Sequence, residues 1–213
     1  MVTCSEVKEI LVEVSSIIDK KKLYLSELDA AIGDGDHGLN LSKGFKAVKE
    51  KIQGASNDDI GNVLKTAGMA LVTTVGGASG PLYGTAFMKG SAVVNNKSSI
   101  DMNDFLNILT EALNGIKMRG KSTEGEKTMI DTLSPVVDGI KKDLEEGKDS
   151  STILEDIRDI SRKGMESTRD IIATKGRASY LKERSIGHKD PGATSMYYIL
   201  DTICECILNK KGE

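Results

Sequence analysis

Apolar side chains recur every three or four residues along four stretches of this chain, and this spacing constrains the fold more than any other feature of the sequence. On a helix, residues spaced in this way form one stripe that a folded protein buries against neighbouring helices. A strand would instead need alternating apolar and polar residues, and no long segment alternates. The stripes are Val7, Ile10, Leu11, Val14, Ile17 and Ile18; Phe105, Ile108, Leu109, Ala112, Leu113 and Ile116; Ile153, Leu154, Ile157 and Ile160; and Ala193, Met196, Tyr197, Leu200, Ile203, Cys204 and Ile207. They predict an all-α protein.

The rest of the chain is compatible with further helices. It has only 3 proline residues, which break helices, and only 4% aromatic residues, which favour strands. Residues 59–75 form another helical window, and so do Met129–Ile140, where Pro135 must either kink the helix or delay its start. We expect about eight helices with short connections, packed as antiparallel neighbours in a single domain over residues 1–213.

The charge and cysteine content exclude several classes of protein. Lys and Arg total 29 against 32 Asp and Glu, a formal net charge of −3, so no basic excess favours nucleic acid or a membrane surface. No apolar run reaches membrane-spanning length. Cys4, Cys204 and Cys206 match no metal motif, and their odd number argues against a disulfide framework. The N-terminus lacks the pattern of a signal peptide, so we expect a cytoplasmic protein.

Glycines concentrate in three loops, and the first loop also holds three aspartates. In the segment Leu28–Gly38, Asp29, Asp34 and Asp36 lie within eight residues. Carboxylates this close repel one another unless a cation lies among them. Oxygen ligands without cysteine suit Mg²⁺, Mn²⁺ or Ca²⁺ rather than zinc. The loop therefore predicts a site for a divalent metal.

Two other interpretations of this loop are less favoured. An EF-hand calcium loop begun at Asp34 would put Phe45 where a glutamate is required, and one begun at Asp29 would put Ala31 at a ligand position. A solvated Asp–Gly turn is the simpler alternative. However, the segment from His37 continues straight into a helical pattern, and the N-terminus of a helix is a natural phosphate site.

The other two glycine loops predict less on their own. Small residues at 76–80 would let a phosphate reach backbone N–H groups, but no Walker A lysine follows. In the third region, Arg177 is suited to pair with a diphosphate. Asp190–Gly192 predicts first a plain turn, and the lone His188 is more typical of a structural residue.

Taken together, four motifs follow the order in which dihydroxyacetone kinases carry them. They are LDAAIGDGDHGLN, GGASGPLYG, GEKTMIDTL, and KGRASYL followed by GHKDPGA. From about Val7 to Ile207, the chain resembles the nucleotide-binding L subunit of these kinases and the homologous C-terminal domain of their ATP-dependent members. The resemblance implies a barrel-like bundle of eight antiparallel helices with a nucleotide bound at one end.

The resemblance also assigns roles to the residues that match the motifs. It implies two Mg²⁺ ions held by Asp29, Asp34 and Asp36. It implies contacts to ADP or ATP from His37, Gly38, Leu39, Asn40, Ala78, Ser79, Gly120, Met129, Arg177, Asp190, Pro191 and Gly192. No side chain is expected to act as a nucleophile, because phosphoryl transfer depends on positioning and charge neutralisation.

A copy of this domain without an attached dihydroxyacetone-binding domain resembles the phosphotransferase-system version of the kinase. In that version ADP stays bound, and a phosphohistidine on one partner subunit converts it to ATP. The phosphoryl group then passes to dihydroxyacetone on a second partner subunit. A regulatory or ligand-sensing relative stays open as an alternative, as does the nucleotide-binding subunit of a different kinase, such as fatty acid kinase. A homodimer also stays open.

Overall fold

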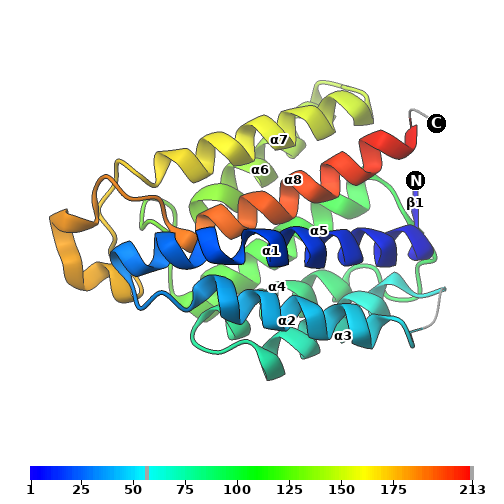
Figure 1. The fold of residues 1–213 in the computed structure, drawn as a ribbon. Helices are drawn as coiled ribbons and strands as arrows, with labels where there is room; N and C mark the ends of the chain where they lie inside the picture. The colour runs from blue at the N-terminus through cyan, green and yellow to red at the C-terminus, as the bar shows by residue number, and fades with distance from the viewer. Residues whose placement is uncertain (56–57, 212–213) are drawn as a thin grey trace.

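Eight α-helices form a closed ring in the computed structural model, which describes residues 1–55 and 58–211. Each helix packs against the next along the chain, and the last packs against the first (Figure 1). The helices are α1 (Cys4–Ile32), α2 (His37–Ile52), α3 (Ile60–Thr74), α4 (Ser79–Ala92), α5 (Met102–Gly120), α6 (Ile130–Glu145), α7 (Ser150–Ser167) and α8 (Pro191–Lys211). The predicted all-α, barrel-like bundle of antiparallel helices is confirmed.

Three short elements complete the fold. A 3-10 segment, η1 (Arg177–Ser185), lies between α7 and α8 and is broken at Lys182, which has a φ of 52°. β1 (Val2–Thr3) pairs antiparallel with β2 (Ser99–Ile100) at the end of the barrel that holds both chain termini, whereas η1 lies at the opposite end (Figure 1). The sequence did not predict the strand pair, because two residues are too few to show alternation.

The predicted stripes line the inside of the barrel, and the first is longer than expected. Ile18, Leu25 and Ile32 of α1 are all buried. Each lies seven residues, or about two helical turns, after the one before it, so the stripe continues to the end of the helix. α1 therefore reaches Ile32 and includes Asp29, which the sequence placed in a loop.

α6 corrects a second expectation. The helix begins at Ile130 and runs through Pro135 to Glu145, so a late start is wrong. Pro135 has no N–H to donate to the carbonyl four residues earlier. The apolar side chains of this helix, including Ile130 and Leu133, are nevertheless buried in the core. Their burial stabilises the helix across the missing hydrogen bond.

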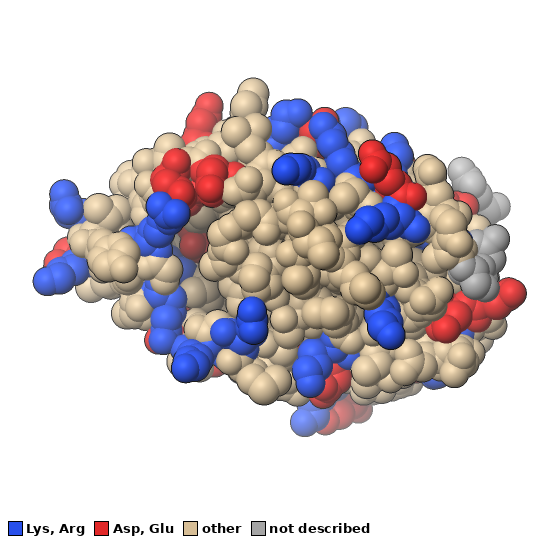
Figure 2. Space-filling model, turned by 90° about the horizontal axis from the view of Figure 1, so that it is seen from below, with Lys and Arg blue, Asp and Glu red and all other residues tan. Residues whose placement is uncertain are grey.

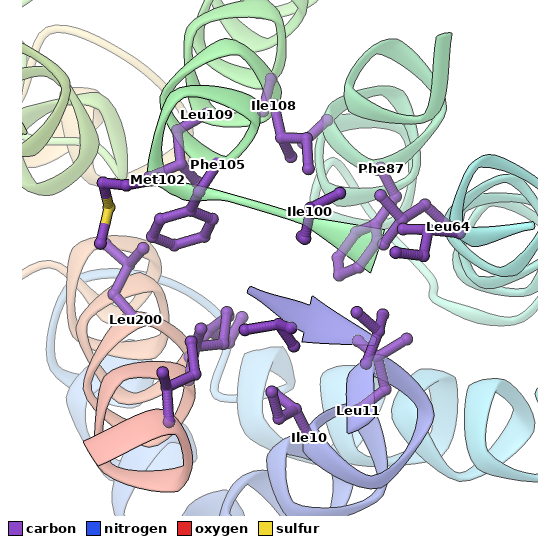
Figure 3. Close-up of a pocket in the computed structure, with 18 of the residues that line it drawn as sticks. Ile10, Leu11, Leu64, Phe87, Ile100, Met102, Phe105, Ile108, Leu109 and Leu200 are labelled. Atoms are coloured by element: carbon purple, nitrogen blue, oxygen red, sulfur yellow. The ribbon is translucent and has the colours of Figure 1, made fainter. Parts of the chain in front are cut away.

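Apolar side chains leave a cavity of about 170 Å³ in the half of the barrel near the termini. Figure 3 shows Ile10 and Leu11 of α1 facing Phe105 and Leu109 of α5 across it. The two strands cross this end of the space (Figure 3). Separately, no helix among the described residues has both the length and the hydropathy needed to cross a bilayer.

Candidate functional site

The N-termini of α2, α4, α6 and α8 meet around a cleft of about 530 Å³ at the end of the barrel opposite the chain termini. Their first residues, His37, Ser79, Ile130 and Pro191, all line it. Helix N-termini carry partial positive charge and unpaired N–H groups, which bind anions. Within the described part of the chain, no side chain of the N-cap residue caps α2, α4 or α6. Lys and Arg side chains also gather near this end on the face shown in Figure 2.

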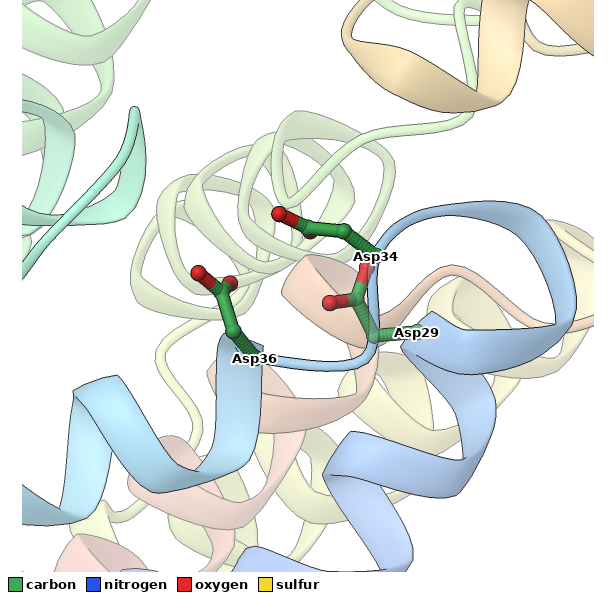
Figure 4. A group of neighbouring side chains, drawn as sticks. All are labelled: Asp29, Asp34 and Asp36. Atoms are coloured by element: carbon green, nitrogen blue, oxygen red, sulfur yellow. The ribbon is translucent and has the colours of Figure 1, made fainter.

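The three aspartates converge at one edge of this cleft. Oxygen atoms of Asp29, Asp34 and Asp36 all lie within 4.8 Å of one another, and Figure 4 shows the three carboxylates grouped around the turn between α1 and α2. Gly35, with a φ of 78°, permits this tight turn. Asp29 also accepts a hydrogen bond from the backbone N–H of His37 at 3.1 Å, which fixes its direction. The donor set consists only of carboxylate oxygen, which fits Mg²⁺.

Arg177 reaches this cluster from the connection between α7 and α8. Its guanidinium lies 2.8 Å from the Asp34 carboxylate, and both side chains are partly exposed. Behind it, Ala173 and Ala178 pack against Ile32 in a small apolar cluster separate from the main core. The connection therefore packs against the end of α1, and its Arg177 guanidinium lies at the acidic edge of the cleft.

His37 links three helices beneath the cleft. Its Nδ1 lies 3.0 Å from the Ser79 hydroxyl of α4, and its Nε2 lies 2.9 Å from the Ser195 hydroxyl of α8. Ser195 is in turn 2.7 Å from the Tyr83 hydroxyl. Burial lowers the pKa of His37, although the charges of Asp29 and Asp36 oppose this. Through these two hydrogen bonds the ring joins the N-termini of α2 and α4 to α8.

Two ionisable residues, Asp190 and Lys127, line the cleft next to α8. The Asp190 carboxylate accepts the N–H of Ala193 at 2.6 Å and so caps α8. Burial raises the pKa of Asp190 to about 7, while the nearby charge of Lys127 opposes the shift. Burial also lowers the pKa of Lys127, whose side chain is 1% exposed.

The sequence profile of the DAK2 domain matches residues 31–205, most of the chain. The chain belongs to the DAK2 domain family. Two curated relatives are similar over nearly their whole length. One is the ADP-binding subunit DhaL of a PEP-dependent dihydroxyacetone kinase of Escherichia coli, 40% identical over 91% of this chain and 92% of the relative. The other is the ADP-binding subunit DhaL of PEP-dependent dihydroxyacetone kinase 1 of Listeria innocua, 46% identical over 84% of each.

Solved structures share the fold of this DAK2 domain. The dihydroxyacetone kinase from C. freundii, in complex with AMP-PNP and Mg²⁺, superposes with a TM-score of 0.71 and is 23% identical. The match covers 93% of this chain and 33% of that one. At this identity, the likeness supports the barrel architecture alone.

The DAK2 domain brings almost all of the predicted site residues together. The cleft is lined by Asp29, Asp34, Asp36, His37, Asn40, Ala78, Ser79, Gly120, Met129, Arg177, Asp190, Pro191 and Gly192. Gly38 and Leu39 are not part of its lining. Gly38 packs against α1, where an added Cβ would overlap the carbonyl of Lys22, and the Leu39 side chain is 52% exposed. The interpretation of Asp190–Gly192 as a plain turn is wrong, because α8 begins there.

Several lining residues had no role in the sequence prediction. Lys127 and Thr128 come from the connection between α5 and α6, Arg119 from the end of α5, and Lys175 from the segment before η1. Lys127 lies inside one of the recognised motifs, beside Met129. A lysine among glycine and threonine in such a motif was the available indication, since nothing in a helical stripe requires it.

Proposed function

We propose that this DAK2 domain binds ADP and ATP with Mg²⁺ and serves as the nucleotide-carrying subunit of a dihydroxyacetone kinase. The observation that carries the proposal is that one cleft holds both a cluster of three carboxylates and three helix N-termini. Among the residues described, the N-cap side chains of these three helices, α2, α4 and α6, do not cap them. In a magnesium diphosphate, the cation matches the carboxylates and the phosphate anion matches the positive helix N-termini. The names of relatives 40% and 46% identical to this chain support the same nucleotide.

Each part of the cleft has a distinct task in this proposal. Asp29, Asp34 and Asp36 would hold two Mg²⁺ ions, which when bound would neutralise the charge developing on the transferred phosphoryl group. The N–H groups that begin α4 would bind phosphate oxygens. Arg177, now paired with Asp34, would turn to the phosphates once cations satisfy that carboxylate.

The phosphoryl group would travel on the nucleotide and not on a histidine of this chain. Both ring nitrogens of His37 are engaged by hydroxyl groups, those of Ser79 and the buried Ser195, so neither is presented to a donor. We propose that a phosphohistidine on a partner subunit phosphorylates the bound ADP, and that dihydroxyacetone on a second partner subunit accepts the group. The buried thiols of Cys4 and Cys204 form no disulfide among the described residues and are suited to the reducing cytoplasm, where we place this reaction.

Reconstitution with labelled phosphoenolpyruvate tests this relay. The three subunits and the general phosphotransferase components are mixed, and the reaction is stopped before dihydroxyacetone is added. We expect the label in ATP that is released when this chain is denatured. Acid-labile label that stays attached to this chain, on His37 or His188, would overturn the nucleotide relay.

A further inference from the structure

Lys127 is a buried cation that the proposed chemistry does not use directly. It lies in the connection between α5 and α6, with a φ of 61°, a left-handed conformation that is uncommon for a lysine. Its side chain is almost fully buried. Burying an ammonium group is costly unless each N–H finds an acceptor. Such a residue needs a reason beyond packing.

Among the described residues, the acceptors of this ammonium are three backbone carbonyls of one segment. Nζ donates to Thr168 O, to Ile171 O at 3.3 Å and to His188 O at 2.5 Å. Thr168 and Ile171 lie where the chain leaves α7, and His188 lies where it returns to α8. One nitrogen therefore joins both ends of the α7–α8 connection (Arg169–Lys189).

Neighbouring hydrogen bonds close the base of the same connection. The N–H of Gly187 donates to Arg169 O at 2.8 Å, and the N–H of Asp190 donates to the Thr168 hydroxyl at 3.0 Å. Among the residues described, Arg177 is the only charged residue of the connection that forms an ion pair with the Asp cluster. The position of Arg177 over the cleft thus depends on how firmly the base of its connection is held.

We propose that Lys127 is the positioning residue for Arg177: its ammonium clamps the two ends of the Arg169–Lys189 connection and so holds the guanidinium over the phosphate end of the cleft. Because it acts through backbone carbonyls, Lys127 need not touch the nucleotide. Lys127 belongs to the α5–α6 connection, which also places Met129 in the lining of the cleft. Its hydrogen bonds therefore join the α5–α6 connection to the α7–α8 connection beside the site. The inference rests on the proposed nucleotide function.

The first test needs no nucleotide. Lys127→Met keeps the length of the side chain and removes the ammonium. We expect amide hydrogen exchange in residues 169–189 to become at least about tenfold faster, while α3 and α4 keep their protection. Lys148→Met is the control, because Lys148 also bridges two acceptors, Asp143 and Asp156, but at the far end of α6. Unchanged exchange in Lys127→Met would overturn the clamp.

The second test is a double-mutant cycle on Mg-ADP affinity, measured by calorimetry. If Lys127 acts by placing Arg177, then Lys127→Met and Arg177→Ala each weaken binding, and the double variant is no weaker than Arg177→Ala. Additive losses, or a loss in Lys127→Met without one in Arg177→Ala, would contradict the proposal. If Lys127→Met does not fold, Lys127→Arg replaces it, because a planar guanidinium cannot offer one nitrogen to three carbonyls. Failure of the wild type to bind Mg-ADP would instead refute the proposed function, and the exchange experiment would still decide the clamp.

Discussion

Replacing Asp36 by asparagine should stabilise the nucleotide-free protein and destabilise the protein in the presence of Mg-ADP. Of the three aspartates, Asp36 is the one whose substitution disturbs the fewest other contacts. Asp29 accepts a backbone hydrogen bond and Asp34 pairs with Arg177, whereas the Asp36 side chain does not cap the helix that follows it. Asparagine removes the charge and keeps the shape.

The expected magnitudes follow from the geometry. Two unit charges 4.8 Å apart repel by about 1 kcal/mol in water-like surroundings, and Arg177 already offsets part of the charge on Asp34. Removing the Asp36 charge should therefore raise the free energy of unfolding by about 1 kcal/mol, or the melting temperature by about 2–4 °C. Mg-ADP at a hundred times its Kd should stabilise the wild type by about 2.7 kcal/mol. The variant should lose most of that gain.

Differential scanning fluorimetry at low salt, with and without Mg-ADP, measures both effects. Asp138→Asn is the matched control, since Asp138 is exposed on α6 away from the cleft. The control should melt like the wild type in both conditions. Asp36→Asn with a lower melting temperature than the wild type in the absence of nucleotide, or with a full shift on adding Mg-ADP, would refute the reasoning.

Three further changes probe other parts of the molecule. Arg177→Ala should leave the melting temperature within about 4 °C of the wild type, because an exposed ion pair contributes at most about 1 kcal/mol. The same variant should slow the reconstituted kinase at least about tenfold. Turnover equal to that of the wild type would make Arg177 a solvated loop residue. Because burial raises the pKa of Asp190 from 3.8 to about 7, the folded state holds this proton more tightly than the unfolded state, so the free energy of unfolding of the nucleotide-free protein should fall across that pH range. Urea titrations should show a flatter pH profile for Asp190→Asn, and an identical slope would contradict the burial of its charge. Leu154→Ala, at the fully buried wall of the apolar cavity, should cost about 2–5 kcal/mol, against at most about 0.5 kcal/mol for Leu23→Ala, whose side chain is 65% exposed; similar losses would argue against the cavity wall.

The sequence predicted the helices because helical periodicity is a local property, whereas the barrel was implied by the family resemblance. The stripes that begin at Val7, Phe105, Ile153 and Ala193 all became inward-facing helices. The extent of α1 was missed because none of the residues between Ile18, Leu25 and Ile32 is buried, so the stripe thins to one buried residue every seven. The strand pair was missed because it depends on contact between segments about a hundred residues apart.

The candidate site divides in the same way. Asp29, Asp34 and Asp36 are close in the sequence, so their convergence could be predicted from local spacing. Lys127 could not be given a role, because its partners lie on a segment 41 to 61 residues further along the chain and are backbone carbonyls, which no motif records. Gly38 illustrates the opposite case, since a residue inside the strongest motif packs against α1.

Native mass spectrometry of the protein, purified without added nucleotide and then mixed with Mg-ADP, tests the central claim most directly. The account predicts a complex of one chain with one ADP and magnesium that dissociates when EDTA is added. The same complex should form with Asp138→Asn and not with Asp36→Asn. A wild-type spectrum that shows only the bare chain at saturating Mg-ADP, or an ADP complex that is indifferent to EDTA and to Asp36→Asn, would contradict a nucleotide site built on the three aspartates.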